Sequence, residues 1–323
     1  MKALAVFSGG LDSMLAAQLI RAQGIDVLGL FFETPFFQAP RAERSAEMIH
    51  LPLKVIDVTE PHLEVVKNPR YGYGGNMNPC IDCHAFMLRN AMDRLAEENA
   101  RFIITGEVLG QRPMSQNLRA LSTVAARSGS PRLVLRPLSA KLLQPTLPEE
   151  KGWVDRRALL ALSGRSRKPQ MELAKAFNII EYPSPAGGCL LTDPVFSRRL
   201  KDLLQSRPQC RVREIELLKV GRHFRLGPET KAVVGRNKKE NEGIVSLAGE
   251  SDLIIKVDSV PGPVVLVVGD VSPRTEDLAV ALALSYSDAQ DGEAAGVTLT
   301  RGGTETRKSA SARAKSEFQP FMI

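Results

Sequence analysis

The chain has 323 residues, of which 43% are apolar and 24% charged, and its formal net charge is +7. This length and apolar content allow two folded domains. The sequence contains no run of about 18 apolar residues, so we expect no membrane contact through a transmembrane helix. Four cysteines are too few for a disulfide-rich secreted scaffold, and no signal peptide precedes the first apolar segment. We therefore expect a cytoplasmic protein.

The first half of the chain alternates apolar strand patterns with helical patterns. We expect strands at 3–7, 26–32, 53–58, 101–105 and 132–135, and helices at 13–23, 41–50 and 82–99. This alternation predicts an α/β fold with a doubly wound parallel sheet, in which ligands lie beyond the carboxyl ends of the strands. The segments "SGG", "FFET" and "TGE" each follow one of these strands. We assign residues 1–180 to this domain.

The second half has a different character. Two further helices are expected at 155–162 and 169–177, followed by a Pro/Gly-rich linker at 181–204 that contains Cys189. Beyond it, "KAVVGRNKKENEGI" and "GPVVLVVGD" predict strands and turns, and "TEDLAVALALSYSDA" predicts an amphipathic helix. We expect a second, smaller α+β domain at 205–323, partly flexible near 301–315, where the sequence is polar and basic.

Basic residues are concentrated in two segments. Residues 207–239 contain ten Lys and Arg against three acids, and residues 151–175 contain seven against two. Such clusters indicate a polyanionic partner, most simply nucleic acid. A solvated surface is the alternative interpretation of either cluster.

The most specific motif is "SGGLDS" at residues 8–13, between the first strand and the first helix. Its backbone N–H groups and the helix dipole favour an anion, but it lacks the lysine of a P-loop and the spacing of a dinucleotide-binding turn. The motif resembles the pyrophosphate loop of the PP-loop ATPases, which form adenylated intermediates. "NPCIDC", "TGEVLGQ" and "SPAGGCLLTDP" resemble motifs of the tRNA thiouridine synthetases in that superfamily. The later "VVGRNKKENEGI" is similar to the NFACT-R domain, a presumed RNA-binding module.

The first resemblance implies an ATP site with a Mg²⁺ ion. The phosphates would be held by Ser8, Gly9, Gly10, Leu11, Asp12 and Ser13, the last two with the metal. Phe31 would border the adenine, and the same cleft would be lined by Gly106, Glu107 and Gln111. Asp12 is also counted among the catalytic residues. The implied activity is adenylation of a uridine or cytidine carbonyl in tRNA and its replacement by sulfur, with release of AMP and pyrophosphate.

Three cysteines are candidates for the sulfur chemistry. Cys80 and Cys83 form a C-x2-C at the start of an expected helix, whose dipole favours a thiolate, and Cys189 lies in the Gly-rich segment. They could act as a persulfide pair, as ligands of a [4Fe–4S] cluster, or in a structural zinc site or simple packing. His50, His62 and His223 stand at no ligand spacing, and we expect packing or surface roles for them.

The expected partners are tRNA or another RNA and a sulfur donor, such as a cysteine desulfurase or a carrier protein. Two alternatives remain open at this point. One is a PP-loop ligase or thiolase that acts on a small molecule, and the other is a non-catalytic RNA- or ribosome-binding adaptor.

Overall fold

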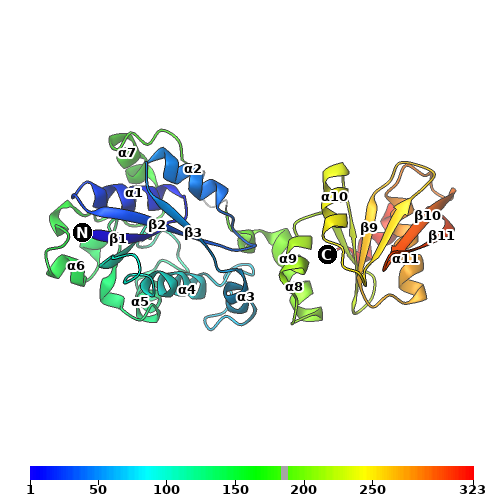
Figure 1. Cartoon of the computed structure of the whole chain (residues 1–323), viewed down its shortest axis with the longest axis horizontal. Helices are drawn as coiled ribbons and strands as arrows, with labels where there is room; N and C mark the ends of the chain where they lie inside the picture. Colours follow the sequence, from blue (N-terminus) through cyan, green and yellow to red (C-terminus); the bar gives the residue numbers. More distant parts are fainter. Residues whose placement is uncertain (183–187) are drawn as a thin grey trace. The chain divides into compact units, whose positions relative to one another are not determined.

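The computed structural model describes residues 1–182 and 188–323. The chain divides into two compact units, Met1–Thr192 and Asp193–Ile323 (Figure 1). The predicted Pro/Gly-rich linker falls in part on residues 183–187, which lie outside the described residues. No described helix is long and apolar enough to cross a membrane.

The first unit is built on a five-stranded parallel sheet. Its strands lie in the order β3-β2-β1-β4-β5, and their bounds are β1 Lys2–Val6, β2 Asp26–Glu33, β3 Leu53–Asp57, β4 Phe102–Thr105 and β5 Val134–Leu135. The order reverses at β1, which pairs with β2 on one side and β4 on the other. A reversal of this kind opens a crevice at the carboxyl edge of a doubly wound sheet. The predicted α/β fold with a second, smaller domain is confirmed.

Helices cover both faces of this sheet (Figure 1). One face carries α1 Leu11–Arg21, α2 Pro40–Met48 and α7 Lys168–Ala176, and the other carries α3 Thr59–Lys67, α4 Cys80–Met92 and α5 Leu118–Arg127. Each face has its own apolar core, centred on residues such as Phe7 and Leu15 on the first and Leu4 and Leu88 on the second. A one-turn helix, α6 Leu147–Glu150, completes the unit. Because helices in such folds run back from the carboxyl edge, the amino ends of α1, α2 and α4 lie at that edge.

The expected helix at 155–162 is wrong. Only a 3-10 turn forms there, Arg156–Ala158. The reason lies in the backbone hydrogen bonds, since the N–H of Leu160 donates to Pro137 and that of Leu162 donates to Leu138. These groups are bonded to a distant segment instead of to a preceding turn of helix.

The second unit contains a six-stranded antiparallel sheet in the order β11-β10-β8-β9-β7-β6. The strands are β6 Arg222–Arg225, β7 Thr230–Val234, β8 Leu253–Val257, β9 Val264–Gly269, β10 Ala294–Arg301 and β11 Thr304–Ser311. The predicted amphipathic helix is α11 Pro273–Ser285, which buries Ala279, Leu282 and their neighbours in the core of the unit. Its other helices are α8 Pro194–Ser206, α9 Val212–Leu217 and α10 Lys238–Ser246.

Three expectations for the second half differ from the structure. Helix α8 occupies much of the segment expected as a linker, and α10 occupies residues expected as strands and turns. The side chain of Asn237 caps α10 by accepting from the N–H of Glu240. The segment 301–315 is not a flexible arm, because most of it forms the β10–β11 hairpin. Its turn is Gly302-Gly303, with φ of 54° and 78°, the left-handed pair that a two-residue hairpin requires.

Candidate active site

The turn after β1 is shaped by two glycines. Gly9 has a φ of +72°, and a Cβ atom there would lie 2.6 Å from the Cα of Ala42 on α2. Its carbonyl accepts a hydrogen bond of 2.8 Å from the Ser45 hydroxyl. Gly10 then forms the amino cap of α1 without a side chain over the exposed N–H groups. The turn is therefore held from α2 and presents bare backbone at a helix amino end, a site suited to phosphate.

Asp12 lies in the first turn of α1 and is only partly satisfied. Its Oδ2 accepts a hydrogen bond of 2.9 Å from Nε2 of Gln111, whereas its buried Oδ1 has no hydrogen-bond partner among the described residues. Burial raises the pKa of Asp12, and Gln111, Arg167 and Arg112 oppose the rise. An unsatisfied buried carboxylate oxygen suits a hard cation or a donor group. This residue therefore fits the Mg²⁺ ion that the sequence implies.

The end of β4 approaches this helix closely. A Cβ atom on Gly106 would lie 2.5 Å from the backbone nitrogen of Ser13, so only glycine fits there. The hydroxyl of Ser13 donates to the carbonyl of Gly10 at 2.7 Å and lies 3.4 Å from the hydroxyl of Ser8. The structure thus brings these predicted residues together at one end of α1. Leu11 is different, because its side chain is fully buried in the core.

Two other predicted residues are engaged inside the protein. Glu107 is 7% exposed, and its two oxygens bond Nδ1 of His84 at 2.8 Å and Nε of Arg136 at 2.9 Å. Burial favours a higher pKa for Glu107, but Arg136 and His84 outweigh it and lower the pKa to about 2. The ring of Phe31 is also buried and lies edge-on to Phe37, with centroids 6.3 Å apart. The side chain of Glu107 therefore anchors the end of β4, and Phe31 packs in the core.

Three residues near Asp12 escaped the sequence analysis. Arg112 and Arg167 are close enough to lower the pKa of Asp12, and Gln170, which is 1% exposed, also lowers it. Arg167 and Gln170 come from the basic segment 151–175, and the backbone of Gly164 bonds to Leu109 at 2.8 Å. This contact brings the segment beside the "TGEVLGQ" loop. The charge count signalled it, but only the fold places it at the site.

The cysteines of the C-x2-C have different surroundings. Cys80 is the first residue of α4, and Nδ2 of Asn78 donates to its Sγ at 3.2 Å. Cys83 lies one turn later and is buried, with its Sγ 3.1 Å from Nε2 of His62. Burial raises the pKa of the Cys83 thiol far above its usual value, and the neighbouring Cys189 and Cys80 add to the rise. Cys83 is therefore a thiol in this conformation.

Cys189 is carried to the same edge of the sheet by its neighbours. The N–H of Leu190 donates to the carbonyl of Phe36, just after β2, at 3.0 Å. Nδ2 of Asn76, in the loop before α4, donates to the carbonyl of Thr192 at 2.9 Å. Burial is the main cause that raises the pKa of Cys189 to about 11; Cys80 contributes to the rise, and the backbone of Leu191, together with Arg112, opposes it. Arg112 lowers the pKa of both Asp12 and Cys189, which places the two residues on the same side of the sheet edge.

His62 is another residue that the sequence did not single out for this site. Its ring is fully buried, and the rings of Phe36, Phe37 and Phe86 lie within 5.8 Å, measured between centroids. Burial lowers the pKa of His62 to about 4, so the imidazole is neutral at physiological pH. The only sequence signal was a histidine at helical spacing in a weakly apolar segment.

The fourth cysteine, Cys210, is a buried residue of the second unit.

The same side chains do not form a metal site in this structure. Within residues 1–182 and 188–323, no three His, Cys, Asp or Glu side chains are grouped so as to hold a metal ion. Two of the three candidate thiols instead contact His62 and Asn78. The residues as arranged do not fit a preformed iron–sulfur or zinc site.

Comparison with known families agrees with the two-unit architecture. Residues 1–141 match the family model described as Thiamine biosynthesis protein (ThiI), and residues 221–322 match the model described as NFACT protein RNA binding domain. The chain joins a ThiI-like domain to an NFACT-R-like domain. Both resemblances noted in the sequence are confirmed.

Two curated relatives match about a third of the chain. The chain is 28% identical over 120 residues to the tRNA-specific 2-thiouridylase MnmA of Karelsulcia muelleri, covering 34% of this chain and 32% of that protein. It is 33% identical over 109 residues to MnmA of Syntrophomonas wolfei, covering 31% and 32%. The chain therefore spans about a third of the length of these relatives.

Two solved structures are similar to parts of the chain. A 4-thiouridine synthetase–RNA complex with bound ATP is 21% identical, covers 67% of this chain and 52% of its own, and has a TM-score of 0.39. The C-terminal part of a fibronectin/fibrinogen-binding protein from Streptococcus suis is 18% identical, covers 55% and 84%, and has a TM-score of 0.29.

Proposed function

We propose that this chain is an ATP-dependent RNA sulfurtransferase that adenylates a base carbonyl, most simply in tRNA, and replaces the oxygen with sulfur. One observation carries the proposal. The bare turn before α1, the partly satisfied Asp12 and the segments that hold Cys80 and Cys189 all lie at the carboxyl edge of one parallel sheet. The ThiI-like and NFACT-R-like matches support the same class.

The first step is activation of the base. The N–H groups of Gly9 and Gly10 and the amino end of α1 hold the β- and γ-phosphates of ATP as a pyrophosphate leaving group. Asp12 would hold a Mg²⁺ ion, which would supply charge neutralisation to these phosphates. The base oxygen attacks the α-phosphorus, and Arg112, beside Asp12, stabilises the charge that develops there. The products are an O-adenylated base and pyrophosphate.

The second step is sulfur transfer. A persulfide on Cys189, loaded by a cysteine desulfurase or a carrier protein, attacks the activated carbon, and the C–S bond forms as the C–O bond to AMP breaks. The Cys80 thiol then attacks the sulfur of Cys189 in the resulting disulfide-linked base. The thiolated base leaves, and a Cys80–Cys189 disulfide remains. Cys80 fits this role because it heads α4, where Asn78 donates to its sulfur.

A single-turnover assay on the full chain tests both steps. The protein, purified without oxygen, is mixed with a tRNA transcript, ATP labelled at the α-phosphate and a persulfide donor, and AMP, pyrophosphate and thionucleosides are measured. We expect AMP formation that requires tRNA. Asp12→Asn reduces it by about 100-fold, because ion binding at the leaving group is lost. Asp26→Asn, an exposed aspartate at the opposite end of β2, is the matched control and has no effect.

The cysteine variants separate the two chemistries. Cys189→Ser keeps pyrophosphate release but forms no thionucleoside, whereas Cys210→Ser, in the second unit, behaves like the native protein. If AMP forms at the same rate with and without tRNA, an RNA substrate is contradicted and a small-molecule ligase or thiolase is favoured. Failure to convert ATP under any condition contradicts the enzyme and favours an adaptor. Iron bound at about four ions per chain, with loss on Cys80→Ser, contradicts the persulfide route and favours a cluster.

A further inference from the structure

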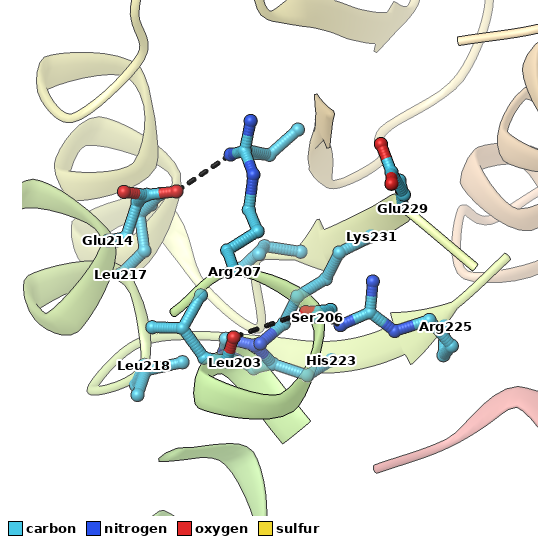
Figure 2. A pocket seen from close by; sticks show the side chains of 12 residues that line it. Leu203, Ser206, Arg207, Glu214, Leu217, Leu218, His223, Arg225, Glu229 and Lys231 are labelled. Atoms are coloured by element: carbon cyan, nitrogen blue, oxygen red, sulfur yellow. Dashed lines mark hydrogen bonds and ion pairs between the residues drawn. The ribbon is translucent and has the colours of Figure 1, made fainter. Parts of the chain in front are cut away.

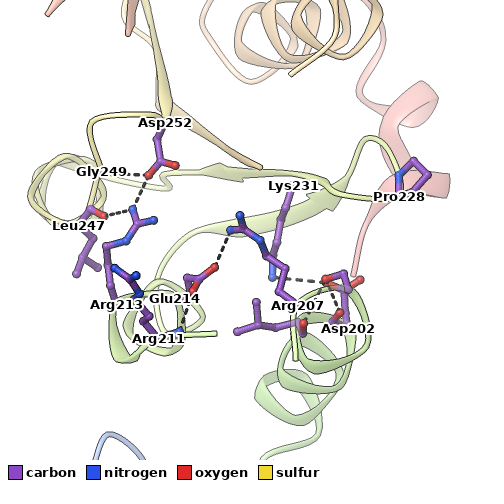
Figure 3. A network of polar contacts seen from close by, with 12 residues as sticks. Asp202, Arg207, Arg211, Arg213, Glu214, Pro228, Lys231, Leu247, Gly249 and Asp252 are labelled. Carbon is purple, nitrogen blue, oxygen red and sulfur yellow. Dashed lines mark hydrogen bonds and ion pairs between the residues drawn. The ribbon is translucent and has the colours of Figure 1, made fainter. Parts of the chain in front are cut away.

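The basic segment 207–239 of the second unit is largely neutralised inside the unit. Of its ten cations, seven lie within 4.0 Å of a carboxylate oxygen, and all residues of this segment are described. They are Arg207, Arg213, Lys219, Arg225, Lys231, Arg236 and Lys238. Figure 3 shows several of these ion pairs, including those of Arg207 with Glu214 and Arg213 with Asp252. The charge count along the chain therefore does not locate an anion-binding surface.

The buried Lys231 does not provide such a surface either. It lines a cavity with Arg207, Arg225 and His223 (Figure 2). Its Nζ atom has no hydrogen bond to any described residue and lies 3.6 Å from Asp202. The cavity has a volume of only about 20 Å³, which is room for one water molecule. A phosphate group does not fit in it.

A different group of cations gathers at the β6 edge of the sheet. The guanidinium of Arg222 lies 5.1 Å from the ring centroid of Tyr286, and the ammonium of Lys315 lies 5.5 Å from the same centroid. Arg313 follows directly after β11, and its N–H donates to the hydroxyl of Ser285 at 3.2 Å. Two cations from segments far apart in the sequence thus face one aromatic ring, and the backbone of Arg313 lies beside Ser285, the residue before that ring.

These cations differ from the paired ones in what surrounds them. Across residues 1–182 and 188–323, no carboxylate forms an ion pair with Arg222, Arg313 or Lys315. Arg313 and Lys315 are exposed, and Arg222 is half-buried against the ring. Tyr286 is itself fixed by Phe224, with centroids 5.7 Å apart. The ring therefore holds the Arg222 side chain in place without neutralising it.

We propose that Arg222, Tyr286 and Lys315 form the surface through which the second unit binds the sugar–phosphate backbone of RNA. Uncompensated cations release counterions when they meet phosphates, whereas cations already paired with acids gain little. Preorganisation of Arg222 by the aromatic ring lowers the entropic cost of that contact. The inference rests on the proposed function, because it names where the RNA substrate of that function is held.

The test measures binding of a fluorescent tRNA transcript to the full chain over a series of salt concentrations. Arg222→Ala/Lys315→Ala removes two uncompensated cations, and Arg236→Ala/Lys238→Ala, the matched control, removes two paired ones. We expect the first variant to bind about 10–100-fold more weakly and to lower the salt slope, d log K/d log [salt], by about 1.4–1.8. The control changes the affinity by less than about threefold. Arg222→Lys/Lys315→Arg keeps the charge and retains most of the salt slope.

The outcomes distinguish this inference from the proposed function. If the native protein binds RNA and both alanine variants bind it with the same affinity as the native protein, the proposed surface is wrong and the sulfurtransferase proposal stands. If the native protein does not bind RNA at all, both are contradicted. Equal loss in the two alanine variants would also overturn the inference, because binding would then follow total charge and not this surface.

Discussion

Two half-buried aspartates show how differently the units treat a carboxylate. In the first unit, Asp12 accepts one hydrogen bond from Gln111 and leaves its Oδ1 without a partner. In the second unit, Asp202 bonds two nitrogens of Arg225 and also lies 3.6 Å from Lys231. A satisfied carboxylate contributes to the fold, whereas an unsatisfied one at a strand end indicates a missing ligand. The difference points to chemistry in the first unit and to scaffolding at this network of the second.

Glu107 gives the strongest test of this comparison, because it is a satisfied carboxylate within the first unit. Glu107→Gln leaves the buried Arg136 without its countercharge, and we expect a loss of about 3–5 kcal/mol in the free energy of unfolding of the first unit. The fluorescence of Trp153, the only tryptophan, reports this unit alone in a denaturant titration. A loss below about 1 kcal/mol would mean that Glu107 is not an anchor.

The same variant has a defined pH dependence. The pKa of Glu107 falls from an ordinary 4.5 to about 2, so the folded protein binds this proton less readily than the unfolded chain. Its contribution is therefore complete above pH 4.5 and is lost as the pH falls toward 2. We expect the difference in stability between the native protein and Glu107→Gln to shrink through that window. A difference that stays constant down to pH 2 would contradict the assignment.

Gly9 tests whether the phosphate turn needs its unusual backbone. Gly9→Ala places a Cβ 2.6 Å from the Cα of Ala42 at a φ of +72°, and we expect a destabilisation of about 1–3 kcal/mol together with weaker ATP binding. Gly243→Ala, in α10 with nothing near the added Cβ, is the matched control in the second unit. It should raise stability by about 0.5–1 kcal/mol. Equal effects of the two substitutions would show that the turn is not specifically constrained.

Lys231 tests the scaffolding role of the second unit. Burial lowers its pKa from 10.5 to about 8, so between pH 8 and 10.5 the unfolded chain binds more protons and the stability of the unit rises with pH. Lys231→Met should remove that rise. It should also increase the free energy of unfolding of the second unit by about 1 kcal/mol at pH 7, because a buried apolar side chain needs no countercharge. Unfolding of the second unit is followed by circular dichroism, as the transition during which the fluorescence of Trp153 in the first unit does not change. A destabilised variant would show that the ammonium is needed for the fold.

The sequence was most informative where the backbone conformation can be adopted readily by only one residue type, glycine. The turn at Gly9 and Gly10 could be placed because an apolar strand precedes it and a helix follows. The Gly302-Gly303 turn carried the same kind of signal, but the exposed polar strand after it hid the hairpin.

What could not be predicted depends on contacts between distant segments. The partners of the basic residues 207–239, the meeting of His62 with Cys83, and the approach of Arg167 to Asp12 are all set by tertiary packing. The failed helix at 155–162 belongs to the same class, because its N–H groups bond to Pro137 and Leu138. The local sequence pattern indicates the helix or strand propensity of a segment, but it does not indicate which distant segment the residues will contact.

The central claim is that the chain exchanges oxygen for sulfur in RNA. The most direct measurement compares the thionucleosides of tRNA from cells with the intact gene, cells without it, and cells that carry Asp12→Asn or Cys189→Ser. The account predicts that one thionucleoside disappears when the gene is removed and is not restored by either variant. An unchanged thionucleoside profile in cells without the protein would contradict it.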